Sequence, residues 1–551
     1  MTKHLNVSVG GVSVRPEAGA MIMDVIPAGA RESGALGAVC ANSLAELTDS
    51  IYEDCKIDLL DIGHRPGHMI YQRSAALLLV YAVKTVLGPG ADVVIKHSVN
   101  KNLSWEVYGA DPGDGGGELA GRLEEVMRKA AEDDMPIDRI TMTLRQAAPI
   151  LAAAGDHDAL NMLKFRRSST VTLYKLGGHW VCLQGPVVPS AGYVKDFKLI
   201  PDKTGFILRI PNPSSSRQHI DIFSLRKIRE VYQESSAWAK IMGVDNVGAL
   251  NTAICDMHGG DIIRVNEALH QKRLAEIAEE IYRGGKTVAL IAGPSSSGKT
   301  TFSKRLCVHL RALGMEPSLI SLDNYFHNKV NAPLDDFGKP DLESFDFLDR
   351  DQLKKDLARL LDGEIVKMPT YNFLTGEREY RGDTMNLGPR GILVLEGIHG
   401  LNHQLTDNVP KENKYRIFIS VMTQINLDRH NRIPTSDTRL IRRIVRDMRY
   451  RGRAAVGTLE MWESVSRGEE KNIFPFQEDV DVVFNSALVY EMCVLKQYAE
   501  SLLFAIGENS PCRPDARRLL GHLDSFVPLP HDDVPNDSLL REFIGGGCFS
   551  H

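Results

Sequence analysis

The stretch Thr287–Thr301, TVALIAGPSSSGKTT, decides the fold of the region around it. A short apolar run, Val288 to Ile291, leads into Gly293–Thr300, which fits the pattern GxxxxGK[ST]. A strand, this loop and a following helix make a P-loop. Its glycines let backbone N–H groups face phosphate oxygens, and the helix points its N-terminus at them. The stretch therefore predicts a nucleotide-binding site.

Each part of the loop has an expected contact with the nucleotide. Lys299 is expected to reach the β- and γ-phosphates, and the Thr300 hydroxyl is expected to bind Mg²⁺. Apolar residues at helical spacing follow, from Phe302 to Leu313. The residues predicted to hold the nucleotide are Gly293, Pro294, Ser295, Ser296, Ser297, Gly298, Lys299, Thr300 and Thr301.

The composition is that of an ordinary globular protein. Of 551 residues, 43% are hydrophobic and 25% are charged, and the net charge of -6 argues against a dedicated nucleic-acid binder. This length suggests roughly three to four domains. The eight cysteines are scattered with no CxxC pair, which fits a reducing compartment. The N-terminus lacks the apolar core of a signal peptide, and the longest apolar run, Ala75 to Val83, is too short to span a bilayer. We expect a cytoplasmic protein that does not enter a membrane.

Two acidic residues follow apolar strands after the P-loop. The run Ser318–Leu322 ends at Asp323, and Arg390–Leu395 ends at Glu396 in Walker B form. Ligands lie at the carboxyl ends of strands in doubly wound sheets, so both acids should face the P-loop. Asp323 could then accept the proton of an attacking hydroxyl, and both acids could lie at Mg²⁺. An alternative role for Asp323 is that of a helix N-cap.

An arginine-rich helix lies between two further strands, Tyr415–Val421 and Val480–Phe484, which complete a predicted parallel sheet of at least five strands. Guanidinium groups suit bidentate phosphate contacts, so we interpret the helix as a lid over the nucleotide. An RNA-binding helix is the alternative. Its arginines are Arg439, Arg442, Arg443, Arg446, Arg449, Arg451 and Arg453.

Five motifs occur in order and at matching spacing: GPSSSGKTT, SLDNYF, KMPTYNF, VLEGIHG and TRLIRRIVRDMRYRGR. Together they resemble the uridine kinase branch of the P-loop kinases, to which phosphoribulokinase is related. The resemblance implies a P-loop kinase domain of the α/β class, with a doubly wound parallel sheet, over residues 287–503. It also implies that the protein uses ATP with Mg²⁺ and transfers a phosphoryl group to the 5′-hydroxyl of a nucleoside. Uridine and cytidine are the acceptors that the resemblance favours.

The resemblance also assigns roles to residues of this sequence. Asp323 matches the catalytic base, and Lys299, Arg446 and Arg451 match the catalytic groups at the phosphates. The expected metal ligands are Thr300, Asp323 and Glu396. The residues that match contacts to the acceptor are Asp323, Tyr325, Glu343, Tyr371, Arg443 and Arg453.

Two positions depart from the pattern of pyrimidine nucleoside kinases. Gly376 stands where those enzymes have a histidine that reads the base, and Met461 stands where they have a glutamine. A pocket without those polar groups should discriminate weakly between bases. A kinase of another nucleoside or of a sugar-like hydroxyl compound is therefore an alternative. His399 is a candidate substitute for the missing histidine.

The N-terminal half resembles parts of threonyl- and alanyl-tRNA synthetases. Residues 1–61, with a hairpin over Leu5–Val14, look like the TGS module, an α+β domain of the β-grasp type. Residues 62–220 carry YQRSAALLL, GPVVP and FKL, which resemble stretches of the second additional domain, the editing domain. The positions that match its metal ligands are Arg73, Leu77, Leu183 and Val187, and none of these side chains can bind a metal. We expect the fold without the editing chemistry.

The remaining segments carry weaker signals. His64 and His68 have HxxxH spacing, but Pro66 and Gly67 argue against a helix there. Residues 221–286 are expected to be a helical connector, and 504–551 a tail packed on the kinase domain. Another hypothesis is an RNA-binding regulator, in which the N-terminal half engages tRNA-like structure and the P-loop acts as a switch. Assembly into a homo-oligomer is left open.

Overall fold

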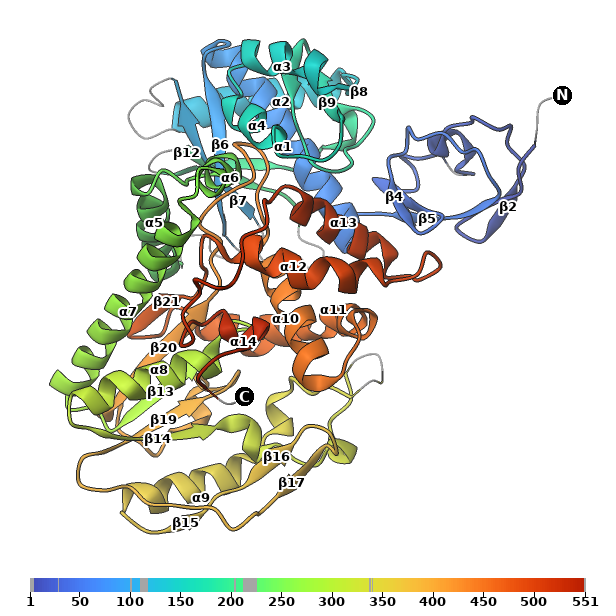
Figure 1. Ribbon diagram of the computed structural model, residues 1–551. Coiled ribbons are helices and arrows are strands. Elements are labelled where there is room, and N and C mark those ends of the chain that lie inside the picture. The colour runs from blue at the N-terminus through green and yellow to red at the C-terminus, as the bar shows by residue number, and fades with distance from the viewer. Residues whose placement is uncertain are drawn as a thin grey trace.

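A five-stranded parallel sheet in the order β14-β19-β13-β20-β21 lies at the centre of the C-terminal half (Figure 1). The computed structural model describes residues 4–27, 29–99, 102–109, 117–202, 205–211, 225–335, 338 and 340–549. The sheet confirms the predicted parallel arrangement. Its strands are β13 (Val288–Ala292), β14 (Glu316–Ser321), β19 (Gly391–Glu396), β20 (Lys414–Ser420) and β21 (Val482–Asn485).

Helices cover both faces of this sheet, which is why its strands read as continuous apolar runs. Alternate residues of β13 face opposite sides. Ala289 and Ile291 pack against α7 (Gly259–Arg283) and α8 (Lys299–Ala312), whereas Val288 and Leu290 lie in the core on the other side. That second face is covered by α5 (Arg226–Ile241) and α9 (Arg350–Leu361).

A group of helices lies beyond the carboxyl ends of the strands and shares one core with the middle of the chain. In Figure 1 the C-terminal segment, drawn in red, crosses this group and ends beside α10 and α8. These helices are α6 (Val247–Cys255), α10 (Thr435–Arg451), α11 (Ala455–Asn472), α12 (Glu491–Phe504), α13 (Arg513–Asp524) and α14 (Arg541–Ile544).

Two short antiparallel ribbons flank α9. One pairs β15 (Val366–Lys367) with β18 (Thr384–Met385), and the other pairs β16 (Thr370–Asn372) with β17 (Glu377–Glu379). Strand β16 of the second ribbon carries Thr370, Tyr371 and Asn372 of the KMPTYNF motif.

The N-terminal residues form a separate five-stranded mixed sheet in the order β2-β1-β5-β3-β4, in which β1 runs parallel to β5. The predicted hairpin is present as β1 and β2, and the short helix expected near Met21–Ile26 is a single 3₁₀ turn, Ile22–Val25. The strands are β1 (Val7–Val9), β2 (Val12–Val14), β3 (Gly37–Cys40), β4 (Ser43–Ala45) and β5 (Cys55–Leu60).

The middle of the chain packs two antiparallel sheets, in the orders β11-β12-β7-β6 and β10-β9-β8, around one long helix. Its helices are α1 (Arg65–Leu87), α2 (Gly117–Glu132), α3 (Leu144–Ala153) and α4 (His157–Leu163). Its strands are β6 (Asp92–Val99), β7 (Asn102–Tyr108), β8 (Asp138–Thr143), β9 (Thr170–Leu176), β10 (His179–Val181), β11 (Lys198–Asp202) and β12 (Gly205–Arg209). The expected boundary at residue 220 lies outside the described residues.

Helix α1 is long and apolar enough to cross a membrane by length and mean hydropathy, which is 1.2. Within the structure, however, 67% of its most apolar window is buried, and it packs against α2 and β6. It is the core helix of this region.

The expectation of no helix at His64–His68 was wrong. Helix α1 begins at Arg65 with Pro66 in its first turn, where the missing N–H of proline is tolerated. The His64 ring lies 2.7 Å from a carboxylate oxygen of Asp61. Across the described residues, no group of three or more His, Cys, Asp or Glu side chains is placed to hold a metal. Of the four positions that match editing ligands, Leu77, Leu183 and Val187 are buried in the core, and Arg73 donates to the Pro186 carbonyl.

Candidate active site

The P-loop joins β13 to α8, as its sequence predicts. Gly298 is the N-cap of α8 and adopts φ +85, a backbone conformation that residues other than glycine rarely adopt. At Gly293 a Cβ atom would lie 2.2 Å from the carbonyl oxygen of Ile419. Both glycines are therefore required by the backbone path. The Lys299 ammonium donates to the Pro294 carbonyl at 3.2 Å, within the loop itself.

Thr300 and Glu396 meet at the mouth of the loop. The Thr300 hydroxyl donates to Glu396 Oε1 at 3.4 Å, and the Ser321 hydroxyl donates to the same oxygen at 3.1 Å. Burial, followed by the nearby charge of Asp323, raises the pKa of Glu396 to about 7. Ser321 was not among the predicted residues, although it ends β14 beside Asp323. The group presents the hard oxygen ligands that Mg²⁺ prefers.

Asp323 lies in the turn η4 (Leu322–Tyr325) directly after β14. Its carboxylate makes no hydrogen bond or ion pair with any described side chain, but it lies in the fields of Lys299, Arg451 and Arg446. Burial raises its pKa, and these three cations oppose that rise. The N-cap alternative fails, because Ser321 occupies the N-cap position of this turn.

Three arginines of α10 converge on Asp447, whose side chain is fully buried. Arg443 Nε lies 3.3 Å from Asp447 Oδ2, Arg446 Nη2 lies 2.8 Å from Oδ1, and Arg451 Nε lies 3.8 Å from Oδ1. Arg443 also donates to the Ser295 hydroxyl of the P-loop at 2.9 Å. Asp447 was missed in the sequence, yet it stands four residues from both Arg443 and Arg451, the spacing of helical ion pairs.

Two other arginines of α10 are buried between helices, and each also donates to a P-loop carbonyl oxygen, Arg439 to Ser295 at 3.3 Å and Arg442 to Ser296 at 3.4 Å. Arg439 makes a bidentate pair with Glu469 at 2.6 and 2.7 Å, and Arg442 pairs with Glu491 at 2.5 Å. All four side chains are at most 5% exposed. These arginines bind α10 to α11 and α12, so the interpretation of all the arginines as lid residues was wrong for these two.

The expected acceptor side is formed around Glu343 and Tyr371. Burial raises the pKa of Glu343 to about 7, Arg443 lowers it, and the charges of Glu469 and Asp323 raise it further. Tyr371, on β16, is 8% exposed and contacts Phe326 edge-on, with ring centroids 5.8 Å apart. Burial, and after it the charge of Asp323, raises the pKa of Tyr371.

Tyr325 does not join this group. Its side chain is fully buried, and its hydroxyl donates to Asp356 Oδ2 of α9 at 3.1 Å. The prediction that it contacts the acceptor was wrong, because the 3₁₀ turn directs it into the core. Arg453 donates to the Met461 sulfur at 2.7 Å, so these two predicted positions touch each other.

The base-reading positions offer little polar surface. Gly376 adopts φ +75, and a Cβ there would lie 2.8 Å from Cβ of Lys329, so the turn leaves no room for a side chain. His399 is 1% exposed and its ring packs against Phe345, with centroids 5.3 Å apart. Neither ring nitrogen has a side-chain hydrogen-bond partner among the described residues.

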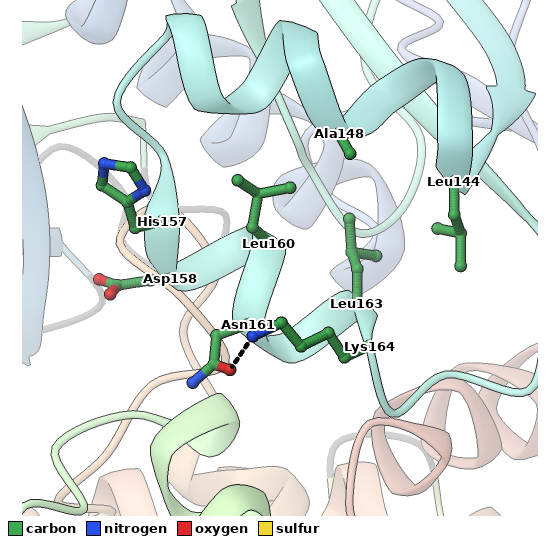
Figure 2. Close-up of a pocket in the computed structure, with 8 residues that line it drawn as sticks. All are labelled: Leu144, Ala148, His157, Asp158, Leu160, Asn161, Leu163 and Lys164. Atoms are coloured by element: carbon green, nitrogen blue, oxygen red, sulfur yellow. Dashed lines mark hydrogen bonds between the residues drawn. The ribbon is translucent and has the colours of Figure 1, made fainter.

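A separate hollow of about 580 Å³ lies between α3 and α4, far along the chain from the P-loop. Figure 2 shows aliphatic side chains of Leu144, Ala148, Leu160 and Leu163 around it, with Lys164 bonded to Asn161 at the rim. None of the predicted site residues lines it.

Known proteins are similar to this chain in the region that contains the P-loop. Residues 288–491 match the model of the Phosphoribulokinase / Uridine kinase family. A uridine kinase of Halobacterium salinarum is 28% identical over 196 residues, which cover 35% of this chain and 77% of that protein. A uridine kinase of Macrococcus caseolyticus is 26% identical over 198 residues, covering 36% and 86%.

Some solved structures are similar to part of the chain. One is described as a possible uridine kinase from Bacillus stearothermophilus, with 19% identity, a TM-score of 0.27, and coverage of 39% of this chain and 98% of that one. Another is D-glycerate 3-kinase from Cryptococcus neoformans, with 14% identity, a TM-score of 0.23, and coverage of 48% and 90%. The family match and the P-loop geometry together identify residues 288–491 as a domain of the phosphoribulokinase/uridine kinase family.

Proposed function

We propose that this protein transfers the γ-phosphoryl group of ATP to the 5′-hydroxyl of a nucleoside, with uridine or cytidine as the first candidates. The observation that carries the proposal is the Asp323 carboxylate. It is unpaired with any described side chain, yet lies near Lys299, Arg446 and Arg451, next to the P-loop. A carboxylate that has no hydrogen-bond partner and lies near cations is suited to accept a proton from an acceptor hydroxyl.

The reaction forms a bond between the acceptor oxygen and the γ-phosphorus and breaks the bond from that phosphorus to the β,γ-bridging oxygen. Asp323 takes the hydroxyl proton as the acceptor oxygen attacks. Lys299, Arg446 and Arg451 stabilise the charge on the transferring oxygens, which is the largest contribution in phosphoryl transfer.

Thr300 and Glu396 would hold Mg²⁺, with Asp323 close to them. Their oxygens already meet within 3.4 Å, and they form the kind of ligand set this ion uses beside phosphates. When bound, the ion neutralises charge on the β- and γ-phosphates.

Glu343 is the candidate for binding the acceptor's ribose hydroxyls, and Tyr371 for contact with its base. Neither Gly376 nor Met461 carries a side-chain N–H or O–H that could donate to a pyrimidine edge. They favour a second candidate function, a kinase of another nucleoside or of a sugar-like hydroxyl compound.

The test is phosphoryl transfer from Mg·ATP to a panel of ribonucleosides and sugars. Asp323→Asn serves as the blank. Asp346→Asn, an exposed acid on the neighbouring turn that pairs with Arg350 at 3.2 Å, is the matched control. Conversion of uridine or cytidine that Asp323→Asn abolishes supports the first function, and preference for another acceptor supports the second. Binding of ATP without transfer to any acceptor contradicts both and favours an RNA-binding regulator.

A further inference from the structure

The C-terminal segment, residues 529–549, places a carboxylate on the P-loop helix. Glu542 Oε2 accepts hydrogen bonds from the backbone N–H of Thr301 at 3.3 Å and from its hydroxyl at 2.9 Å. Thr301 is 1% exposed and Glu542 is 6% exposed, so this contact is closed to solvent. In Figure 1 the short helix α14, which carries Glu542, lies in front of α10 and close to α8.

The segment is anchored on both sides of this contact. Leu539 packs on the loop, with Cδ2 3.4 Å from where a Cβ of Gly298 would lie. The Phe543 ring lies beneath the Arg442 guanidinium, 5.0 Å from its carbon to the ring centroid. The Ser538 hydroxyl bonds to Glu267 of α7. The position of Glu542 is therefore set by several contacts.

Glu542 differs from Glu469, which also accepts a hydrogen bond from a P-loop N–H. Glu469 accepts the Ser295 N–H at 2.9 Å, but its charge is matched by the bidentate pair with Arg439. Glu542 makes no ion pair within the described part of the chain. What stabilises its charge is the first turn of α8, where N–H groups lack helical acceptors and the helix dipole is positive.

A nucleotide needs the same donors. In a P-loop the first-turn N–H groups and neighbouring hydroxyls receive the α- and β-phosphate oxygens. A carboxylate oxygen and a phosphate oxygen are both anionic acceptors, and two anions cannot share the Thr301 donors without strong repulsion. Glu542 occupies the end of the loop that an α-phosphate would use.

We propose that residues 529–549 form an autoinhibitory strap, in which Glu542 competes with the nucleotide α-phosphate for Thr301. The inference rests on the proposed function, because it takes a nucleoside triphosphate as the ligand of the loop. Nucleotide binding then requires that α14 leave Thr301, and the buried residues around it keep the strap attached when no nucleotide is present.

The experiment measures Mg·ATP affinity directly, on the full chain, by calorimetry. Glu542→Gln keeps the shape and removes the charge, and Glu542→Ala removes the acceptor as well. Asp532→Asn, an exposed acid on the same segment, is the matched control. We expect affinity to rise about tenfold in Glu542→Gln, more in Glu542→Ala and not at all in the control, as befits loss of a charged competitor. ATP should also speed amide exchange of residues 536–547 in the unaltered protein.

The outcomes separate this inference from the proposed function. Equal or weaker ATP binding by both Glu542 variants, with tail exchange unaffected by ATP, overturns the strap and leaves the kinase proposal standing. Absence of ATP binding by every variant overturns both. Thermal unfolding of each variant confirms that a change in affinity does not come from a loss of folding.

Discussion

Two sets of arginines on helix α10 differ in the partners that they bind. Arg439 and Arg442 of α10 are buried and paired with Glu469 and Glu491 on neighbouring helices. Arg443, Arg446 and Arg451 gather around Asp447, and Arg446 and Arg451 lie in the field of Asp323. Residue type and helical spacing are alike in the two sets. The difference is the partner, which only the tertiary structure supplies.

The comparison shows how the site is held. The buried pairs fix α10 to α11 and α12. Arg439 and Arg442 also donate to the P-loop carbonyl oxygens of Ser295 and Ser296, at 3.3 and 3.4 Å, so the buried set holds the loop backbone as well. Arg443 joins the arginine cluster around Asp447 to the P-loop, because it contacts both Asp447 and the Ser295 hydroxyl. Stability and catalysis should therefore separate when members of each set are changed.

The largest expected effect is on folding. Arg442→Met leaves Glu491 buried without a partner, so we expect a loss of about 3–5 kcal/mol in the free energy of unfolding. Denaturant titration measures it. The double variant Arg442→Met with Glu491→Met should recover most of this loss, because replacing a buried pair by apolar side chains is nearly neutral. No recovery would mean that the pair is not what holds α12.

The next effect is on the reaction. Arg446→Ala removes a cation whose charge acts on Asp323, where the proposed reaction takes place, so we expect the rate of phosphoryl transfer to fall by roughly 10²–10³. The free energy of unfolding should change little, because Arg443 and Arg451 still pair with Asp447. Single-turnover kinetics measure the rate. A variant that loses stability but keeps its rate would place Arg446 with the buried set.

Another effect is expected from pH. The pKa values of Glu343 and Glu396 are raised to about 7 by burial, so both carboxyls are protonated below that pH. If both carboxylates must be ionised, kcat/KM should fall by about a hundredfold per pH unit well below 7, because two groups are protonated together. The effect of these two raised pKa values on the free energy of unfolding changes with pH in the opposite direction to activity. It is present below the unfolded-state pKa and is lost as pH rises through 7. A flat activity profile from pH 5 to 8 would contradict these roles.

The smallest effect concerns the acceptor. Gly376→His forces a side chain into φ +75 against Lys329, which should cost about 1–2 kcal/mol of stability. It should not lower the KM for uridine, because the turn cannot aim the ring into the site. A clear gain in uridine affinity would show that the turn adapts, and that only the side chain was missing.

Much of the kinase-like domain was predictable from local patterns. The strand–loop–helix at Gly293–Thr300 and the acids after β14 and β19 follow from apolar runs and their carboxyl ends, and the structure brings Thr300, Asp323 and Glu396 together. Asp447 was also within reach, through its spacing to Arg443 and Arg451.

Other features depend on contacts between distant parts of the chain. Glu469, Glu491 and Glu542 lie on helices that follow the recognised motifs, and no local pattern marks an acid as the partner of a buried arginine or of a loop N–H. The acceptor contact predicted for Tyr325 was wrong for a similar reason. A 3₁₀ turn, rather than an extended continuation of β14, sets the direction of its side chain.

The most direct test of the central claim is single-turnover transfer of the γ-phosphoryl group in Asp323→Asn, with ATP affinity measured on the same protein. The account predicts ATP affinity close to that of the unaltered protein and a transfer rate lower by roughly 10²–10⁴, the contribution of a positioned base. Asp346→Asn should leave both quantities unchanged. An Asp323→Asn variant that transfers phosphate at the unaltered rate would contradict the claim that Asp323 accepts the acceptor's proton.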